Sequence, residues 1–131
     1  MGTPRVFFSA ATLGLAALAL GLSASGARAF SASFTWCGGG SPAFTLADVP
    51  SGAASLRFTM IDLNVPTFHH GGGKVGYSGQ PTVPCGAFSS GFLGPSPPPG
   101  EVHTYQFTVQ ALSADGAVLA TTTARRKFPE Q

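Results

Sequence analysis

Three segments of the chain alternate apolar and polar residues with a period of two. They span residues 30–36, 56–60 and 105–111, and in each of them every second side chain is apolar. A period of two places alternate side chains on opposite faces of an extended strand. The pattern therefore predicts three half-buried strands.

A fourth strand is predicted near the C-terminus. Residues 117–124 are rich in Val, Leu and Thr, and Asp115-Gly116 before them is typical of a hairpin turn. After the first 29 residues no stretch carries the apolar stripe of a helix. The chain is therefore predicted to be all-β, an antiparallel β-sandwich.

A long segment between these strands is dominated by glycine and proline. Fifteen of the thirty residues in 71–100 are Gly or Pro, beginning with three glycines at 71–73 and ending with the Pro-rich run 95–100. Such a composition disfavours central strands, and a loop of this length in a compact domain is usually functional or disordered. We expect an ordered, functional loop, with four side chains available to fix it in place: Tyr77, Cys85, Phe88 and Phe92.

The N-terminus has the pattern of a signal peptide. Arg5 precedes an apolar run over residues 6–22, and Ala27-Arg28-Ala29 forms an A-x-A cleavage site. The run is short for a transmembrane span of roughly 20 residues, and no basic cluster follows it. The sequence predicts a leader over 1–29, a domain over 30–131, a periplasmic or secreted location, and no transmembrane segment after the leader is removed.

Removal of the leader changes the electrostatics. Residues 30–131 hold five basic and five acidic side chains, so the domain is formally neutral. Arg125, Arg126 and Lys127 form a short basic run, which is too small for a nucleic-acid footprint and is more typical of a solvated strand end. We expect no nucleic-acid partner.

Cys37 and Cys85 both lie in the predicted exported domain. In an oxidising compartment two cysteines favour one disulfide, and the alternative is a pair of free buried thiols. We expect the Cys37–Cys85 bridge.

Two ionisable residues fall on apolar faces at strand ends. Asp62 continues the face of residues 56–60, and His103 precedes Tyr105 on the apolar face of its strand. Burial of such groups costs several kcal/mol unless they are paired, hydrogen-bonded or open to a cleft. The pattern indicates either a structural Asp–His pair or a functional site.

The neighbouring residues favour an anion site. His69 and His70 follow Asp62, the Gly94-Pro95 turn precedes His103, and Tyr105 adds a hydroxyl. Imidazole, hydroxyl and backbone N–H donors can hold phosphate, sulfate or carboxylate. A zinc site or a Ser-His-Asp triad is less well supported, because the spacing matches no established motif. No metal and no cofactor is expected.

The same residues carry a resemblance to a known family. The matching stretches are SPAF at 41–44, VPSGAASL at 49–56, DLNVPT at 62–67, GPSPPPG at 94–100 and HTYQFTVQAL at 103–112. Together they resemble the phosphatidylethanolamine-binding, or Raf-kinase-inhibitor-like, proteins. The resemblance implies a β-sandwich with a small anion pocket formed by an Asp, two His, a Tyr and loop backbone.

Carried over by motif, Asp62, His103 and Tyr105 match that pocket, and His70 or His69 stands in for its other histidine. The chain departs from the family at several positions. Asn64 replaces the second Asp of the motif, Ser96 replaces a Cys, the tryptophans flanking the other histidine are missing, and residues 73–93 replace longer strand and helical material.

Three functions follow as hypotheses. The first is a binding module for an anionic small molecule or phospholipid head group. The second is a protein-interaction or inhibitor domain, in which the Gly/Pro-rich loop engages a protease or envelope partner. An enzyme is the least supported, so the domain is expected not to be one.

Overall fold

The computed structural model describes residues 1–7, 9–11, 14, 16 and 28–131. Of the predicted leader, residues 8, 12–13, 15 and 17–27 lie outside the described residues, so its apolar run and its cleavage site are described only in part. Within them no helix is long and apolar enough to cross a membrane. The strands all lie in the C-terminal part: β1 (Ser31–Thr35), β2 (Ala43–Ala47), β3 (Ser55–Asp62), β4 (His69–Gly76), β5 (Thr82–Val83), β6 (His103–Leu112) and β7 (Val118–Phe128).

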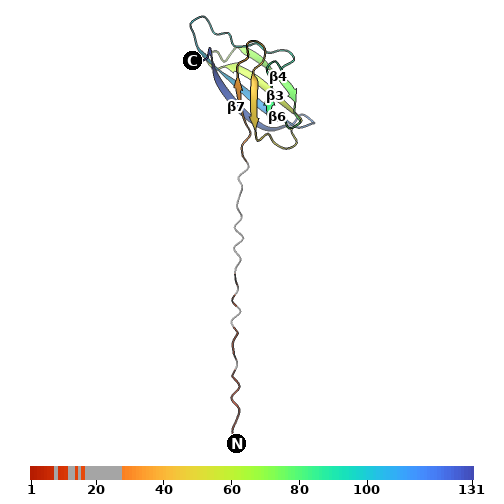
Figure 1. Ribbon diagram of the computed structural model, residues 1–131, viewed down its shortest axis with the longest axis vertical. Coiled ribbons are helices and arrows are strands. Elements are labelled where there is room, and N and C mark those ends of the chain that lie inside the picture. Colours follow the sequence, from red (N-terminus) through yellow and green to blue (C-terminus); the bar gives the residue numbers. More distant parts are fainter. Residues whose placement is uncertain (8, 12–13, 15, 17–27) are drawn as a thin grey trace.

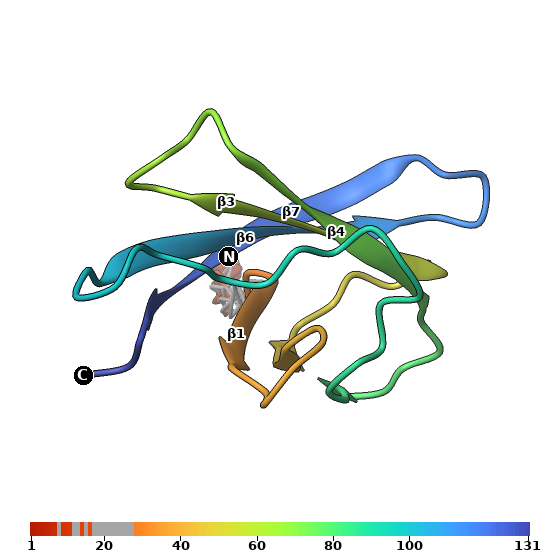
Figure 2. The same cartoon turned by 90° about the horizontal axis from the view of Figure 1, so that it is seen from above.

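These strands form two antiparallel sheets that face each other. One sheet has the order β1-β2-β5 and the other the order β4-β3-β6-β7. Figure 1 shows the strands gathered at the C-terminal end of the chain, and Figure 2 shows the two sheets as separate layers. The prediction of an all-β chain with two sheets is confirmed.

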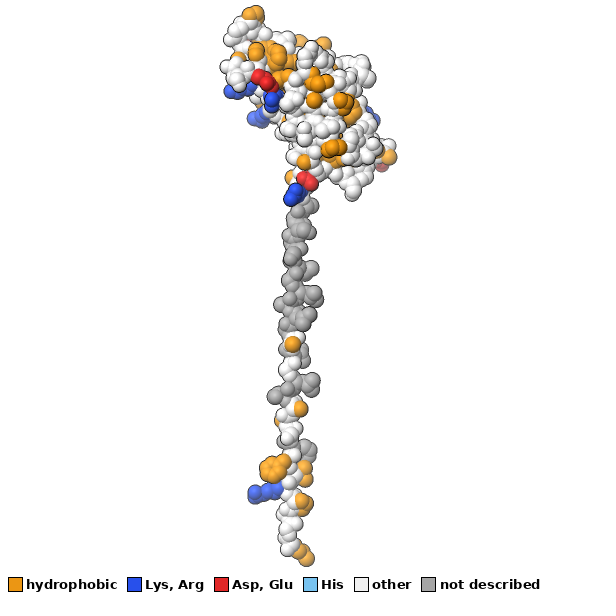
Figure 3. All heavy atoms as spheres, viewed as in Figure 1, with side chains coloured by type: hydrophobic (Ala, Val, Ile, Leu, Met, Phe, Trp, Pro, Cys, Tyr) orange, Lys and Arg blue, Asp and Glu red, His pale blue; other side chains and the backbone are white. Residues whose placement is uncertain are grey.

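The core lies between the layers and is rich in phenylalanine. Phe34 of β1 contacts Phe107 of β6 with ring centroids 5.0 Å apart, and Phe44 of β2 contacts Phe58 of β3 at 4.5 Å. Along β3 and β6 buried residues alternate with exposed or half-buried ones, as the period of two predicts. On the face of the molecule shown in Figure 3, charged side chains are sparse.

The hairpin between β6 and β7 was also predicted correctly. Gly116 has a positive φ of 88° and its N–H donates to the carbonyl of Ser113 at 2.9 Å. A side chain disfavours this backbone region, so glycine suits the turn. The following strand is longer than predicted and continues to Phe128.

The interpretation of Gly71–Gly73 as the start of a loop is wrong, because these glycines lie inside β4. β4 is an edge strand, and its glycines allow the Phe88 ring and the backbone of β3 to approach it closely. A Cβ on Gly73 would lie 2.5 Å from the Phe88 ring, and one on Gly72 would lie 1.8 Å from the Phe58 carbonyl oxygen. The glycines are therefore a packing surface for Phe88 and for the neighbouring strand.

The Gly/Pro-rich loop that does exist runs from the end of β4 to the start of β6, and only β5 interrupts it. Phe88 is buried in the core, and its N–H donates to Ser41 Oγ at 3.1 Å. The predicted Cys37–Cys85 disulfide is confirmed, with the Cα atoms 6.0 Å apart. The loop is thus fixed to both sheets.

Gly73→Ala should destabilise the domain by about 1–3 kcal/mol, because the added methyl group overlaps the Phe88 ring. Gly76→Ala, in the same strand with nothing near the new Cβ, should change stability by less than about 0.5 kcal/mol. Urea denaturation of both variants measures the difference. Equal stability of the two would contradict the packing role of Gly73.

Candidate functional site

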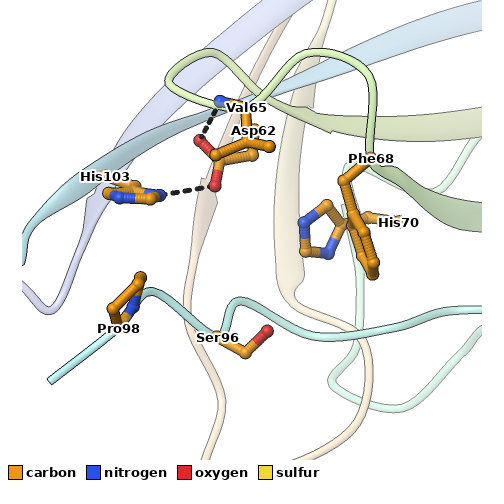
Figure 4. A pocket seen from close by; sticks show the side chains of 7 residues that line it. All are labelled: Asp62, Val65, Phe68, His70, Ser96, Pro98 and His103. Carbon is orange, nitrogen blue, oxygen red and sulfur yellow. Dashed lines mark hydrogen bonds and ion pairs between the residues drawn. The ribbon is translucent and has the colours of Figure 1, made fainter.

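An aspartate and a histidine meet at one end of the four-stranded sheet. Asp62 is the last residue of β3 and His103 the first of β6, and both side chains are buried, with 4% and 7% of their residue surface exposed. His103 Nδ1 lies 2.6 Å from Asp62 Oδ2 (Figure 4). Both residues lie on the inner faces of their strands, as the period of two along the sequence predicts.

Asp62 is also fixed by the turn that follows it. Its Oδ1 accepts hydrogen bonds from the backbone N–H groups of Asn64 at 2.8 Å and Val65 at 3.3 Å. The Asn64 side chain in turn accepts from the N–H of Thr104 at 2.9 Å. Asn64 therefore ties the turn to β6 and helps to position the carboxylate.

The second nitrogen of His103 is also occupied. His103 Nε2 lies 3.1 Å from Glu101 Oε2, and the Glu101 side chain is 56% exposed. The imidazole thus lies between two carboxylates. Sequence reasoning missed Glu101, which lies in the loop just before β6, where no periodicity indicates the direction of a side chain.

The two pKa shifts of the pair have opposite signs. The hydrogen bond to Asp62 raises the pKa of His103 above 6.5, burial opposes this, and Glu101 adds to it. Burial alone would raise the pKa of Asp62, but the hydrogen bonds from His103 and from the Asn64 N–H outweigh it and hold the pKa below 3.8. Between pH 3.8 and 6.5 the pair is therefore a carboxylate and an imidazolium.

A cavity of about 180 Å³ opens beside the pair. Three strands (β3, β4 and β6), the β3–β4 turn and the Pro-rich loop supply its wall, which consists of Asp62, Val65, Phe68, His70, Ser96, Pro98 and His103. In Figure 4 the rings of His103 and His70 lie on either side of Asp62, and Ser96 and Pro98 face them. At about 30 Å³ per water, the volume holds roughly six water molecules, the size of an ion or a head group.

Of the two neighbouring histidines, His70 lines the cavity. Its Nδ1 lies 2.9 Å from the carbonyl oxygen of Leu93, which can only accept, so Nδ1 carries the proton and Nε2 of a neutral ring is an acceptor. His69 pairs with Ile61 in the sheet and is exposed. Consecutive residues of a strand point to opposite faces of the sheet, so only one of the two histidines faces the cavity.

Three other predicted site residues do not line this cavity. Tyr105 is fully buried behind it, where its hydroxyl accepts from the Ser96 N–H at 3.3 Å and its ring contacts His70 at a centroid distance of 5.4 Å. Burial and then the charge of Asp62 raise the pKa of the Tyr105 hydroxyl. Gly94 and Pro95 instead line a separate hollow of about 340 Å³ beside Trp36 and Phe128.

Exposed apolar residues lie in the wall of the cavity and next to two of its histidines. Val65 and Phe68 belong to its wall, Leu93 is bonded through its backbone to His70, and Val102 adjoins His103. Their exposed fractions are 42%, 48%, 55% and 39% in that order. Sequence reasoning did not identify this apolar rim (Val65, Phe68, Leu93 and Val102).

In the part of the chain that the structure describes, no group of three or more His, Cys, Asp or Glu side chains could hold a metal ion. No protein-family model and no curated protein matches the chain. The site is therefore interpreted from its own chemistry.

Proposed function

We propose that this chain is a small exported binding protein that holds an anionic group, a phosphate or a phospholipid head group, in the cavity beside Asp62 and His103. The observation that carries the proposal is the carboxylate–imidazolium pair in the wall of a small cavity, with a second imidazole opposite it. Asp62 orients His103 and keeps it protonated, and the imidazolium supplies the positive N–H donor that an anion requires.

The anion binds in this proposal by taking the place of Glu101. His103 Nε2 is the nitrogen that Asp62 does not occupy, and the carboxylate it contacts belongs to an exposed, rotatable side chain. The neighbouring Ser96 hydroxyl and His70 line the cavity on the Asp62 side of the His103 ring, where other oxygens of the anion would bind. Both neighbours can donate a hydrogen bond, His70 when its ring is protonated at Nε2.

The apolar rim supports a head group that is attached to a lipid. The cavity is smaller than the roughly 300–1,000 Å³ typical of pockets for drug-sized ligands, so it admits the polar end of a lipid and leaves the chains outside. Val65 and Phe68 of the rim belong to the cavity wall and offer exposed apolar surface to such chains. A free phosphate would use the same donors without contacting the rim.

The wider context of the proposal is a shortened domain of the phosphatidylethanolamine-binding type, exported to the periplasm or secreted. The family motifs at 62–67 and 94–112 supply Asp62, Ser96, Pro98 and His103 to the cavity wall. The disulfide supports an oxidising compartment.

Calorimetric titration with sulfate and with inorganic phosphate tests the proposal. Sulfate does not titrate near neutral pH, so its pH dependence reports on the protein alone. The raised pKa of His103 means that its imidazolium persists to a higher pH than that of a free histidine and is lost as the pH rises through the folded value. Sulfate affinity should therefore be higher at pH 6 than above the folded pKa of His103, and should fall about tenfold once the imidazolium is lost, the order of one charge-assisted hydrogen bond.

His103→Ala should abolish this binding, whereas His69→Ala should retain it, because His69 lies on the outer face of the sheet. The second variant removes the same chemical group from a position outside the cavity and controls for nonspecific effects. Equal affinity of both variants, or an affinity independent of pH, would exclude the cavity as an anion site.

A further inference from the structure

The outer face of the four-stranded sheet carries most of the domain's positive charge. Directly paired residues of antiparallel strands lie on the same face of a sheet. Arg57 pairs with Lys74 and with Gln110, Gln106 pairs with Arg125, and Thr104 pairs with Lys127. The four cations of these rows, which we call the basic face, are all exposed: Arg57, Lys74, Arg125 and Lys127.

No acidic side chain lies on the basic face, as far as residues 30–131 are concerned. Asp62 is buried between the sheets, Asp48 follows β2, Glu101 precedes β6, Asp115 is in the β6–β7 turn, and Glu130 follows β7. The domain is formally neutral, yet four of its five cations share one face that none of its acids occupies. The positive charges of the domain are thus concentrated on one face, away from its negative charges.

The arginines of the basic face are held by neutral partners. Arg57 donates to Gln110 Oε1 at 3.3 Å, and Arg125 Nε donates to Gln106 Oε1 at 2.7 Å. Amide oxygens fix the direction of each guanidinium without cancelling its charge. Both cations therefore remain available to an anionic partner.

Between the row of Arg57 and the row of Arg125 lies a polar row of residues, and the half-buried Ile61 is an apolar member of the Arg125 row. Thr59, Thr108 and Thr123 form one row across β3, β6 and β7. The two arginine rows cross β6 at positions 110 and 106, which are separated by about 13 Å along a strand. Figure 2 shows no further layer of strands on this side of the sheet.

We propose that the basic face docks an extended anionic polysaccharide. Guanidinium and ammonium groups recognise its sulfate, carboxylate or phosphate substituents, and the threonine hydroxyls and glutamine amides suit its sugar hydroxyls. A bilayer would favour exposed large apolar side chains between the cations, where threonines lie, and single-stranded nucleic acid would favour aromatic side chains for stacking. The proposal is independent of the cavity beside His103.

Two adjacent arginines provide a matched test. Arg125 lies on the basic face. Arg126 pairs with the buried Tyr105, which places it on the opposite face of the sheet, and it is bonded to Glu130. Arg125→Gln and Arg126→Gln make the same change of charge one residue apart. The probe is dextran sulfate, and uncharged dextran is the control ligand.

At low salt the full domain should bind dextran sulfate and not dextran, and added salt should weaken the binding. Arg125→Gln should weaken it about threefold and Arg57→Gln/Arg125→Gln at least about tenfold, because each lost contact is a partly screened charge pair. Arg126→Gln should stay within about twofold of the wild type.

Several results would overturn the proposal. Equal weakening by Arg125→Gln and Arg126→Gln would indicate net charge rather than a face, and loss of binding in His103→Ala would assign the polymer to the cavity. Binding to anionic vesicles through the same arginines, without binding to dextran sulfate, would indicate a membrane instead. Thermal melting of each variant establishes that it is folded.

Discussion

Replacement of both cysteines by serine should lower the free energy of unfolding by about 4 kcal/mol. The Cys37–Cys85 bridge closes a segment with a sequence separation of 48 residues, and the chain entropy of the unfolded state rises when that segment is released. Cys85 also follows the shortest strand of the domain by two residues. β5 is two residues long and pairs only with Phe44 and Thr45 of β2.

Urea denaturation of the oxidised wild type and of the Cys37→Ser/Cys85→Ser variant measures this loss. A reducing agent should shift the wild type to the stability of the variant and leave the variant itself unchanged, which separates loss of the bond from effects of the serines. A difference below about 1 kcal/mol would mean that the aromatic core alone holds β5 and the loop. Sulfate affinity in both proteins reports whether the loop wall of the cavity depends on the bridge.

The Asp–His pair could be predicted from sequence because parity along a strand is a strong constraint. Asp62 and His103 continue apolar faces whose direction is fixed by several buried neighbours in β3 and β6. A shift by one residue would expose all of those neighbours. The same constraint correctly predicted that Tyr105 faces the inside of the sandwich. It does not predict how deeply a side chain is buried, and the tyrosine lies behind the cavity instead of in its wall.

The strand β4 could not be predicted, because its glycines have no side chains to show a period. Their role depends on Phe88, which approaches from a loop later in the chain. Without knowledge of β4, the sequence could not show which of His69 and His70 faces the inside of the sandwich, so both remained candidates. The pairing of Ile61 with His69 places His69 on the outer face and His70 on the inner one.

Glu101→Gln should raise the affinity for sulfate about tenfold at pH 6 and low salt, because it removes a partly screened carboxylate that competes for His103 Nε2. Glutamine keeps the shape of the side chain and removes its charge. Since Glu101 also helps to raise the pKa of His103, the variant should lose its imidazolium at a lower pH than the wild type. The gain should therefore shrink as the pH rises above 6.5.

The control for this prediction is Glu130→Gln, which removes the same charge from the C-terminal segment, where Glu130 is bonded to Arg126. Calorimetric titration with sulfate at pH 6 and pH 8 should show a gain for Glu101→Gln alone. Equal gains in both variants would mean that only net charge matters. Weaker binding in Glu101→Gln would mean that Glu101 supports the anion site through the charge of His103 and does not occupy it. In either result Glu101 would no longer be a competitor, whereas binding by neither the wild type nor the variant would reject the anion site itself.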